Sequence, residues 1–145
     1  MVLPDVNVLI YAFRPDTADH AVARSWLNTV VHASADYGMS PQVLASFIRI
    51  TTNHRVFARP DRLESALGLA QVLLHRPNCQ VVEPGPRHWE IYADLCRKTK
   101  ASGNLTQDAW FAALAIEAGC EWVTFDRDYA RFPGLRLARI GDHPL

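Results

Sequence analysis

Hydrophobic positions follow two different spacings along the chain, and each spacing predicts one kind of element. Apolar residues three or four positions apart indicate helices, which we expect over residues 6–13, 17–33, 41–52, 62–76, 87–99 and 107–118. Short apolar or alternating runs indicate strands, which we expect over residues 2–4, 37–40, 80–82, 121–124 and 135–140. Because helices and strands alternate, the pattern predicts an α/β fold around a mainly parallel sheet.

Residues that favour helix ends support these boundaries. Ser40 is expected to cap the third helix, with a proline at the first helical position, where the missing N–H costs nothing. Asp61 and Glu64 have the spacing of a capping box for the fourth helix. Thr106 is expected to cap the last helix and Gly119 to end it in a left-handed conformation. Asp108 would then lie in the first turn of that helix, where its charge favours the dipole.

The apolar stripes also predict which side chains face the core. On the fourth helix the expected inner positions are Leu63, Leu67, Ala70 and Leu74. On the fifth helix they are Trp89, Tyr92, Leu95, Cys96 and Thr99. The tryptophans Trp26, Trp89, Trp110 and Trp122 all lie on apolar stripes, and we expect them in the core.

Bulk composition is that of an ordinary soluble globular domain. The chain has 145 residues, and no repeat or linker divides it, so one domain over residues 1–145 is expected. The formal net charge of zero argues against a protein that grips many phosphates, although it allows a local basic patch. Arginines cluster at positions 49, 55, 59 and 62 and again at 127, 131, 136 and 139. A solvated face with scattered ion pairs explains either cluster equally well.

Cysteine usage and hydropathy indicate a reduced, cytoplasmic protein. Cys79, Cys96 and Cys120 are odd in number and lack metal-ligand spacing, so they are expected to be small core residues. Asp5 interrupts the apolar N-terminus and no basic segment precedes it, which argues against a secretion signal. No apolar run approaches the roughly 20 residues of a membrane span.

The most informative residues are acids placed at the edges of apolar runs. Asp5, Asp126 and Asp128 follow predicted strands, and Asp108 lies early in the last helix. Ligands of open α/β sheets bind beyond the carboxyl ends of the strands. Carboxylates gathered there repel one another, and Mg²⁺ or Mn²⁺ would remove that repulsion. Each aspartate alone is more often a structural residue, so the prediction depends on all four together.

Three segments carry a resemblance to a known family: LPDVNVLIYAF, SFIRITTNHRVF and NLTQDAWFAALAIEAGCEWVTFDRDYARFPGL. They resemble the PIN domain, and in particular the VapC toxins of bacterial toxin–antitoxin pairs, in the subgroup common in mycobacteria. The resemblance implies a three-layer α/β/α fold and a Mg²⁺-dependent endoribonuclease that leaves a 5′-phosphate and a 3′-hydroxyl. It also implies inhibition by a VapB-type antitoxin and assembly as a homodimer.

The family's functional positions can be matched to this sequence. Asp5, Asp108 and Asp126 match its metal-binding, catalytic acids. Asp128 matches a more peripheral acid. The supporting positions are matched by Asn7, Thr124 and Arg49.

The departure from the family is Ser46, which stands where a glutamate is usual. A serine has no charge and is a weak ligand for Mg²⁺, and Glu64 and Glu117 are badly placed to replace the missing acid. Three interpretations follow. The three aspartates still bind one metal, or catalysis is weakened while antitoxin and RNA binding persist, or the serine is a variant that silences a toxic nuclease.

Functions of other classes are less well supported. A catalytically inactive PIN domain that acts by binding its antitoxin or RNA is the main alternative. A phosphotransfer domain is the third possibility. A receiver domain needs a lysine after its last strand, and this chain has none well placed there. A haloacid-type phosphatase needs an aspartate where Asn7 stands. The six histidines show no metal-ligand spacing, and no nucleophile elbow or P-loop is present.

Overall fold

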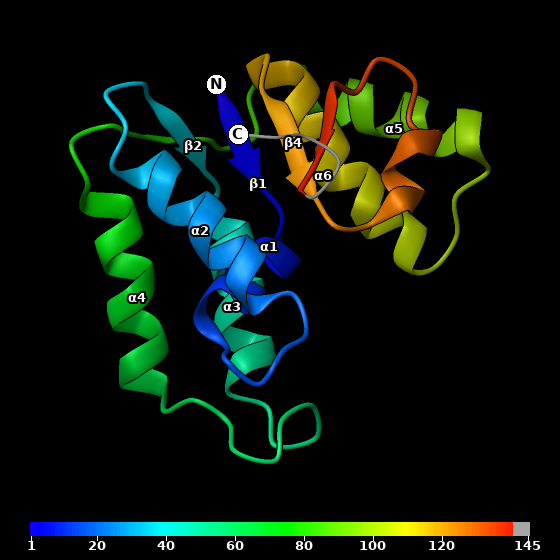
Figure 1. Ribbon diagram of the computed structural model, residues 1–145. Coiled ribbons are helices and arrows are strands. Elements are labelled where there is room, and N and C mark those ends of the chain that lie inside the picture. Colours follow the sequence, from blue (N-terminus) through cyan, green and yellow to red (C-terminus); the bar gives the residue numbers. More distant parts are fainter. Residues whose placement is uncertain (141–145) are drawn as a thin grey trace.

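Short parallel strands run between two groups of helices (Figure 1). The computed structural model describes residues 1–140. In chain order its elements are β1 (Val2–Pro4), α1 (Val6–Phe13), α2 (His20–Val31), β2 (Tyr37–Met39), α3 (Pro41–Thr51), α4 (Leu63–His75), β3 (Cys79–Val81), α5 (His88–Thr99), α6 (Asn104–Ala118), β4 (Glu121–Thr124), the 3-10 helix η1 (Arg127–Arg131) and β5 (Leu137–Arg139). The predicted α/β class with parallel strands is confirmed.

The register of the strands decides which side chains meet. β4 pairs with β1 on one side and with β5 on the other, and β2 pairs separately with β3. β1 also contacts β2, although the two are not joined by a hydrogen-bonded ladder. Pro4 is paired in register with Val123. Because β1 and β4 are parallel, the residues that follow this pair, Asp5 and Thr124, emerge at the same edge of the sheet.

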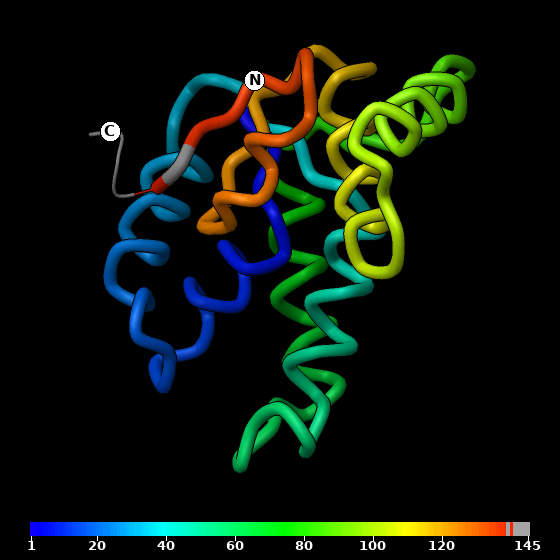
Figure 2. Tube along the Cα trace, turned by 90° about the vertical axis from the view of Figure 1, so that its right-hand side faces the viewer, coloured from blue at the N-terminus to red at the C-terminus, as the bar shows by residue number. Residues whose placement is uncertain are grey.

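Helices cover both sides of the strands. β4 is contacted by α1 and by α6, which belong to the two different helix groups (Figure 1). One group consists of α1, α2, α3 and α4, and the other is the α5–α6 pair. Figure 2 shows that the connection between α3 and α4 projects away from the strands at one end of the molecule. The largest fully buried side chains include Trp122 of β4 and Phe47 of α3.

Several predicted boundaries are confirmed. The elements β1, α1 and β4 have the predicted limits, and β5 is an edge strand. The Ser40 hydroxyl accepts a hydrogen bond from the Val43 amide at 3.3 Å and so caps α3. Gly119 ends α6 with a φ of 68°, a left-handed conformation that favours glycine.

Two predicted helix caps are wrong. α4 begins after Arg62 without a side-chain cap, so Asp61 and Glu64 form no capping box. The carboxylate of Asp61 instead accepts a hydrogen bond from the buried Arg14 guanidinium at 2.9 Å. A charged donor binds a carboxylate more strongly than a backbone amide does. α6 begins at Asn104, ahead of the expected cap at Thr106.

The predicted inner faces of α4 and α5 are also wrong in part. Leu63 is 56% exposed, and the residues that α4 buries are Ala66, Ala70 and Leu73. Trp89 is 67% exposed, while its neighbour His88 is buried. Adjacent residues on a helix are only 100° apart. When apolar residues lie on both sides of a stripe, the sequence therefore allows two assignments of the buried face that differ by one position.

The remaining tryptophans and the cysteines agree better with the sequence. Trp26 and Trp122 are buried, and Trp110 is partly buried between His88 and Tyr92. All three cysteines are free thiols; Cys120 is buried as expected, whereas Cys79 and Cys96 are only partly buried. None of the helices within residues 1–140 combines the length and the apolar character that crossing a bilayer requires.

Candidate active site

A cleft of about 260 Å³ lies at the carboxyl ends of β1 and β4. Six residues singled out in the sequence line it: Asp5, Asn7, Ser46, Arg49, Asp108 and Asp126. The other lining residues are Val6, Ile10, Ile50, Gln107, Phe111 and Tyr129. Acids that are more than 100 positions apart in the sequence therefore share one cavity, because parallel strands end at the same edge of the sheet.

Asp5 is the most deeply buried of these acids. Its side chain is the N-cap of α1 and accepts a hydrogen bond from the Val6 amide at 2.6 Å. Its other carboxylate oxygen accepts a hydrogen bond from the Thr124 hydroxyl at 2.7 Å. Burial raises the pKa of Asp5 to about 7, although both hydrogen bonds lower it. The negative charges of Asp108 and Asp126 raise this pKa further.

Thr124 joins the two strand ends through its hydroxyl group. The hydroxyl donates to Asp5 and accepts hydrogen bonds from the Asn7 side-chain amide at 3.2 Å and from the Asp126 backbone amide at 3.0 Å. The side-chain carbonyl oxygen of Asn7 in turn accepts a hydrogen bond from the Phe125 backbone amide at 3.3 Å. Thr124 is fully buried, so each of these bonds replaces one that water would make. Thr124 and Asn7 therefore hold Asp5 and Asp126 in a fixed relation.

Asp108 lies in the second turn of α6, one turn later than expected, because the helix begins at Asn104. Desolvation raises its pKa, and the charge of Asp126 raises it further. The hydroxyl of Tyr129 donates a hydrogen bond to one carboxylate oxygen at 3.3 Å, which favours the ionised form. Tyr129 is buried and lines the cleft, so it orients Asp108 from η1.

Tyr129 is the residue that the sequence reasoning missed. It lies three positions after Asp126, inside the segment that carries the family resemblance. The available signal was general: a buried tyrosine usually needs a partner for its hydroxyl group. Nothing in the sequence indicated that this partner would be Asp108.

Asp126 and Asp128 are only two residues apart, but Asp126 lines the cleft and Asp128 lies outside it. Asp126 is partly exposed, lines the cleft and caps η1 by accepting a hydrogen bond from the Asp128 amide at 2.8 Å. The side chain of Asp128 is 62% exposed and lies 3.8 Å from the Arg131 guanidinium. Asp128 does not belong to the cleft lining.

Ser46 and Arg49 lie on α3 across the cleft, three positions apart and therefore on neighbouring parts of one helix face. Neither glutamate considered as a replacement for the missing acid reaches the cleft. Glu64 is exposed on α4. Both oxygens of Glu117 accept backbone hydrogen bonds, from Gly85 at 2.7 Å and from Arg87 at 2.8 Å.

The donor chemistry of the cleft fits a hard divalent cation. Asp5, Asp108 and Asp126 offer only oxygen ligands, which suit Mg²⁺ or Mn²⁺. Desolvation and mutual repulsion raise the pKa of Asp5 and of Asp108, and a cation between them would oppose both effects. Within residues 1–140, no three His, Cys, Asp or Glu side chains are already close enough to enclose a metal ion.

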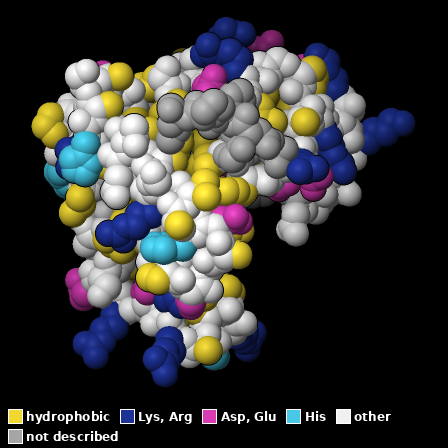
Figure 3. Space-filling model, in the orientation of Figure 1, with side chains coloured by type: hydrophobic (Ala, Val, Ile, Leu, Met, Phe, Trp, Pro, Cys, Tyr) yellow, Lys and Arg dark blue, Asp and Glu magenta, His cyan; other side chains and the backbone are white. Residues whose placement is uncertain are grey.

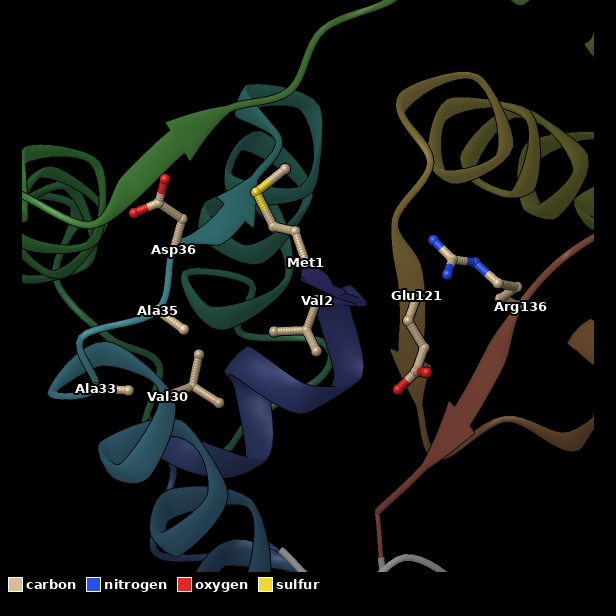
Figure 4. A pocket seen from close by; sticks show the side chains of 8 residues that line it. All are labelled: Met1, Val2, Val30, Ala33, Ala35, Asp36, Glu121 and Arg136. Carbon is tan, nitrogen blue, oxygen red and sulfur yellow. The ribbon is translucent and has the colours of Figure 1, made fainter.

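A larger hollow of about 580 Å³ lies at the opposite, amino ends of the strands (Figure 4). Its walls are mostly apolar, and its charged side chains are Asp36, Glu121 and Arg136. It contains none of the acids or supporting residues that were matched to the family's functional positions. Because ligand sites of open α/β sheets lie at the carboxyl ends of the strands, the smaller cleft remains the candidate active site.

The sequence profile of one family, described as the PIN domain, matches residues 2–135. Among the similar curated proteins, Ribonuclease VapC43 of Mycobacterium tuberculosis is 39% identical over 145 residues, covering 100% of this chain and 96% of that protein. Ribonuclease VapC25 of the same organism is 38% identical over 139 residues, covering 96% of this chain and 98% of the relative.

The fold is also shared with solved structures. VapBC2 from Rickettsia felis, bound to a DNA fragment from its promoter, has a TM-score of 0.71 at 18% identity, over 97% of this chain and 99% of that chain. VapC20 of Mycobacterium tuberculosis, described as a toxin that cleaves the sarcin–ricin loop, has a TM-score of 0.63 at 16% identity, over 94% and 99% of the two chains. At these identities the likeness concerns the fold alone.

Proposed function

Because the chain belongs to the PIN-domain family, we propose that it is a ribonuclease toxin of the VapC type, which hydrolyses RNA phosphodiester bonds with a divalent cation. The observation that carries this proposal is the convergence of Asp5, Asp108 and Asp126 in one cleft. Curated relatives that cover nearly the whole chain are named as VapC ribonucleases, which supports the reaction class. Residues 1–145 would form a single catalytic domain.

In the proposed mechanism Asp5, Asp108 and Asp126 would hold Mg²⁺ or Mn²⁺. Bound there, the cation would supply an activated water molecule and charge stabilisation at a phosphoryl oxygen. Thr124 keeps Asp5 oriented, and Tyr129 does the same for Asp108. Arg49, at the rim of the cleft, is placed to hold a phosphate group. Asp128 would act only from outside the cleft. The family resemblance implies products with a 5′-phosphate and a 3′-hydroxyl.

The second candidate function is binding without catalysis, and Ser46 is the observation that favours it. A neutral side chain at this position leaves the acidic cleft one charge short of the usual family pattern. A weak cation site would leave the fold and its surfaces able to bind an antitoxin or RNA. Solved structures of the same fold include VapBC toxin–antitoxin complexes, which supports a VapB-like partner for this chain. The homodimer remains a prediction.

Cleavage and metal binding, measured together, separate the two functions. We expect the purified wild-type protein to cleave RNA with Mg²⁺ or Mn²⁺, and Ser46→Glu to cleave faster and bind Mn²⁺ more tightly by calorimetry. Asp108→Asn is the matched loss of one charge from the same cleft and should abolish cleavage. If wild type neither binds Mn²⁺ nor cleaves, while Ser46→Glu does both, the result supports the binding function over catalysis by the wild-type protein. If neither protein cleaves or binds the cation, the nuclease proposal is wrong.

A further inference from the structure

The connection between α3 and α4, residues 52–62, carries exposed arginines on a loop at one end of the molecule. Arg55, Arg59 and Arg62 are all exposed. The ribbon and the Cα tube both show that this segment projects away from the strands (Figures 1 and 2). In the space-filling view, basic side chains extend from the same end of the molecule (Figure 3). We call residues 52–62 the basic loop.

The acids near the basic loop are already paired with a buried residue, Arg14. Asp61 is the only acid between positions 49 and 62, and it accepts a hydrogen bond from Arg14 at 2.9 Å. Arg14 also binds Asp16 at 2.6 Å. Among the described residues, the exposed arginines of the loop form no ion pair. The surface of the basic loop is therefore locally positive, although the net charge of the whole chain is zero.

The same Arg14 fixes the shape of the loop. Its guanidinium lies 4.0 Å from the centre of the Phe57 ring and donates to the Arg59 carbonyl at 2.9 Å. The Asp61 amide donates to the Thr51 carbonyl at 2.8 Å, which ties the far end of the loop to α3. A loop held by a buried cation loses little conformational entropy when it binds a partner.

The basic loop directly follows the helix that lines one side of the cleft, although no loop residue belongs to the cleft lining itself. Arg49 lines the cleft from α3, and that helix ends two residues later, where the loop begins. The cleft of about 260 Å³ is small beside the ~300–1,000 Å³ of typical ligand pockets. A polynucleotide that reaches the carboxylates must therefore lie mostly on the surface outside the cleft, and the basic surface next to Arg49 is available to it.

We propose that the basic loop is a docking surface for the phosphate backbone of the RNA strand that enters the cleft. The proposal rests on the proposed function, because that function identifies RNA as the polyanion that the loop would bind. Contacts of this kind are electrostatic, carry no base preference, and become weaker as salt displaces the strand. The loop would thus contribute affinity, while the cleft performs the reaction.

The test measures binding without cleavage. Labelled oligouridylate is titrated with the full-length protein in EDTA at increasing salt concentration. The triple variant Arg55→Gln, Arg59→Gln, Arg62→Gln should weaken binding at low salt at least about tenfold and lower the log–log salt slope by about 2, since each phosphate contact on a single strand contributes about 0.7. The Arg14–Arg59 bond uses the backbone of Arg59 and survives this change.

Two control variants make the result specific. A triple change to lysine at the same positions keeps the charge and should keep the salt slope. The matched control Arg97→Gln, Lys98→Gln, Lys100→Gln removes the same charge from α5 and its C-cap and should bind like wild type. Equal losses in the two glutamine variants would overturn the proposal in favour of net charge alone. Unchanged RNA binding, with loss of binding to an acidic protein partner, would overturn it in favour of that partner. Absence of oligouridylate binding by wild type would also overturn it.

Failure of this inference is distinguishable from failure of the proposed function. Binding in EDTA does not depend on the cation or on Ser46, and cleavage is assayed separately. A wild-type protein that binds oligouridylate through the loop but never cleaves would disprove the nuclease alone. A triple glutamine variant that binds and cleaves like wild type would disprove the docking surface alone.

Discussion

Replacing Asp5 by asparagine should stabilise the metal-free protein at neutral and alkaline pH. Burial raises the pKa of Asp5 from 3.8 to about 7, so the folded protein disfavours the charged form. At about 1.4 kcal/mol for each pKa unit, ionising this carboxyl group in the folded state costs about 4 kcal/mol of stability. Because the pKa is higher in the folded state than in the unfolded state, wild type loses stability as the pH rises. The stability that goes with the neutral Asp5 carboxyl group is fully present below pH 3.8 and is lost as the pH rises through about 7.

The expected gain is smaller than that figure, because asparagine is an imperfect replacement. Its carbonyl oxygen can still accept the hydrogen bond from the Val6 amide. Its NH₂ group cannot accept from the Thr124 hydroxyl, and loss of a hydrogen bond to a charged group costs about 1.5–3 kcal/mol. We therefore expect Asp5→Asn to be more stable than wild type by about 1–2 kcal/mol near pH 8 and less stable near pH 4.

Urea unfolding in EDTA across this pH range tests the prediction. The free energy of unfolding of wild type should fall relative to that of the variant as the pH rises. Asp128→Asn is the matched control, because it removes an exposed carboxylate outside the cleft, and its curve should stay parallel to wild type. Parallel curves for Asp5→Asn and wild type would refute the reasoning. Adding Mn²⁺ near pH 8 should then stabilise wild type more than the variant.

Three further substitutions test separate parts of the structure. Thr124→Val should destabilise the metal-free protein above neutral pH by about 1–3 kcal/mol, since the carboxylate of Asp5 loses its hydroxyl donor; an unchanged urea midpoint would contradict this. Arg14→Met should cost about 2–4 kcal/mol, because Asp61 and a loop carbonyl lose their donor; hydrogen exchange should show the amides of residues 53–61 opening first. Trp89→Ala should change stability by no more than about 0.5 kcal/mol, as expected for an exposed side chain; a loss above that, in thermal unfolding, would mean that Trp89 is packed.

Local rules predicted the ends of β1 and β4 correctly, whereas the predicted limits of β2, β3 and β5 differ from the observed ones by one or more residues. Asp5 and Asp126 follow apolar runs, and parallel strands bring such residues to one edge whatever the intervening sequence is. The chain alone could not indicate which face of α6 would carry Asp108 into the same cleft, and the family resemblance supplied that position. The N-cap of α3 and the C-cap of α6 were readable because serine and glycine act on backbone groups within a few residues.

Interactions between distant segments were not readable. The capping box of Asp61 and Glu64 is a sound local pattern, but Arg14, far away in the sequence, takes the carboxylate of Asp61. The hydrogen bond from Tyr129 to Asp108 joins η1 and α6 only after the fold has formed. On α5 the apolar stripe favoured Trp89 for the core, but His88 packs against Trp110 and is the buried residue.

The contact between Glu117 and the segment before α5 has a consequence for how this chain can vary. The Glu117 carboxylate accepts hydrogen bonds from the amides of Gly85 and Arg87, and a Cβ atom at position 85 would lie 2.7 Å from one of its oxygens. A larger residue at 85 must therefore shift the carboxylate of Glu117, and both hydrogen bonds would lengthen or be replaced by bonds to water, since Gly85 and Arg87 are exposed. Substitutions at positions 85 and 117 should therefore be coupled: replacing Gly85 by alanine should cost less stability in a variant whose Glu117 is already alanine than in wild type.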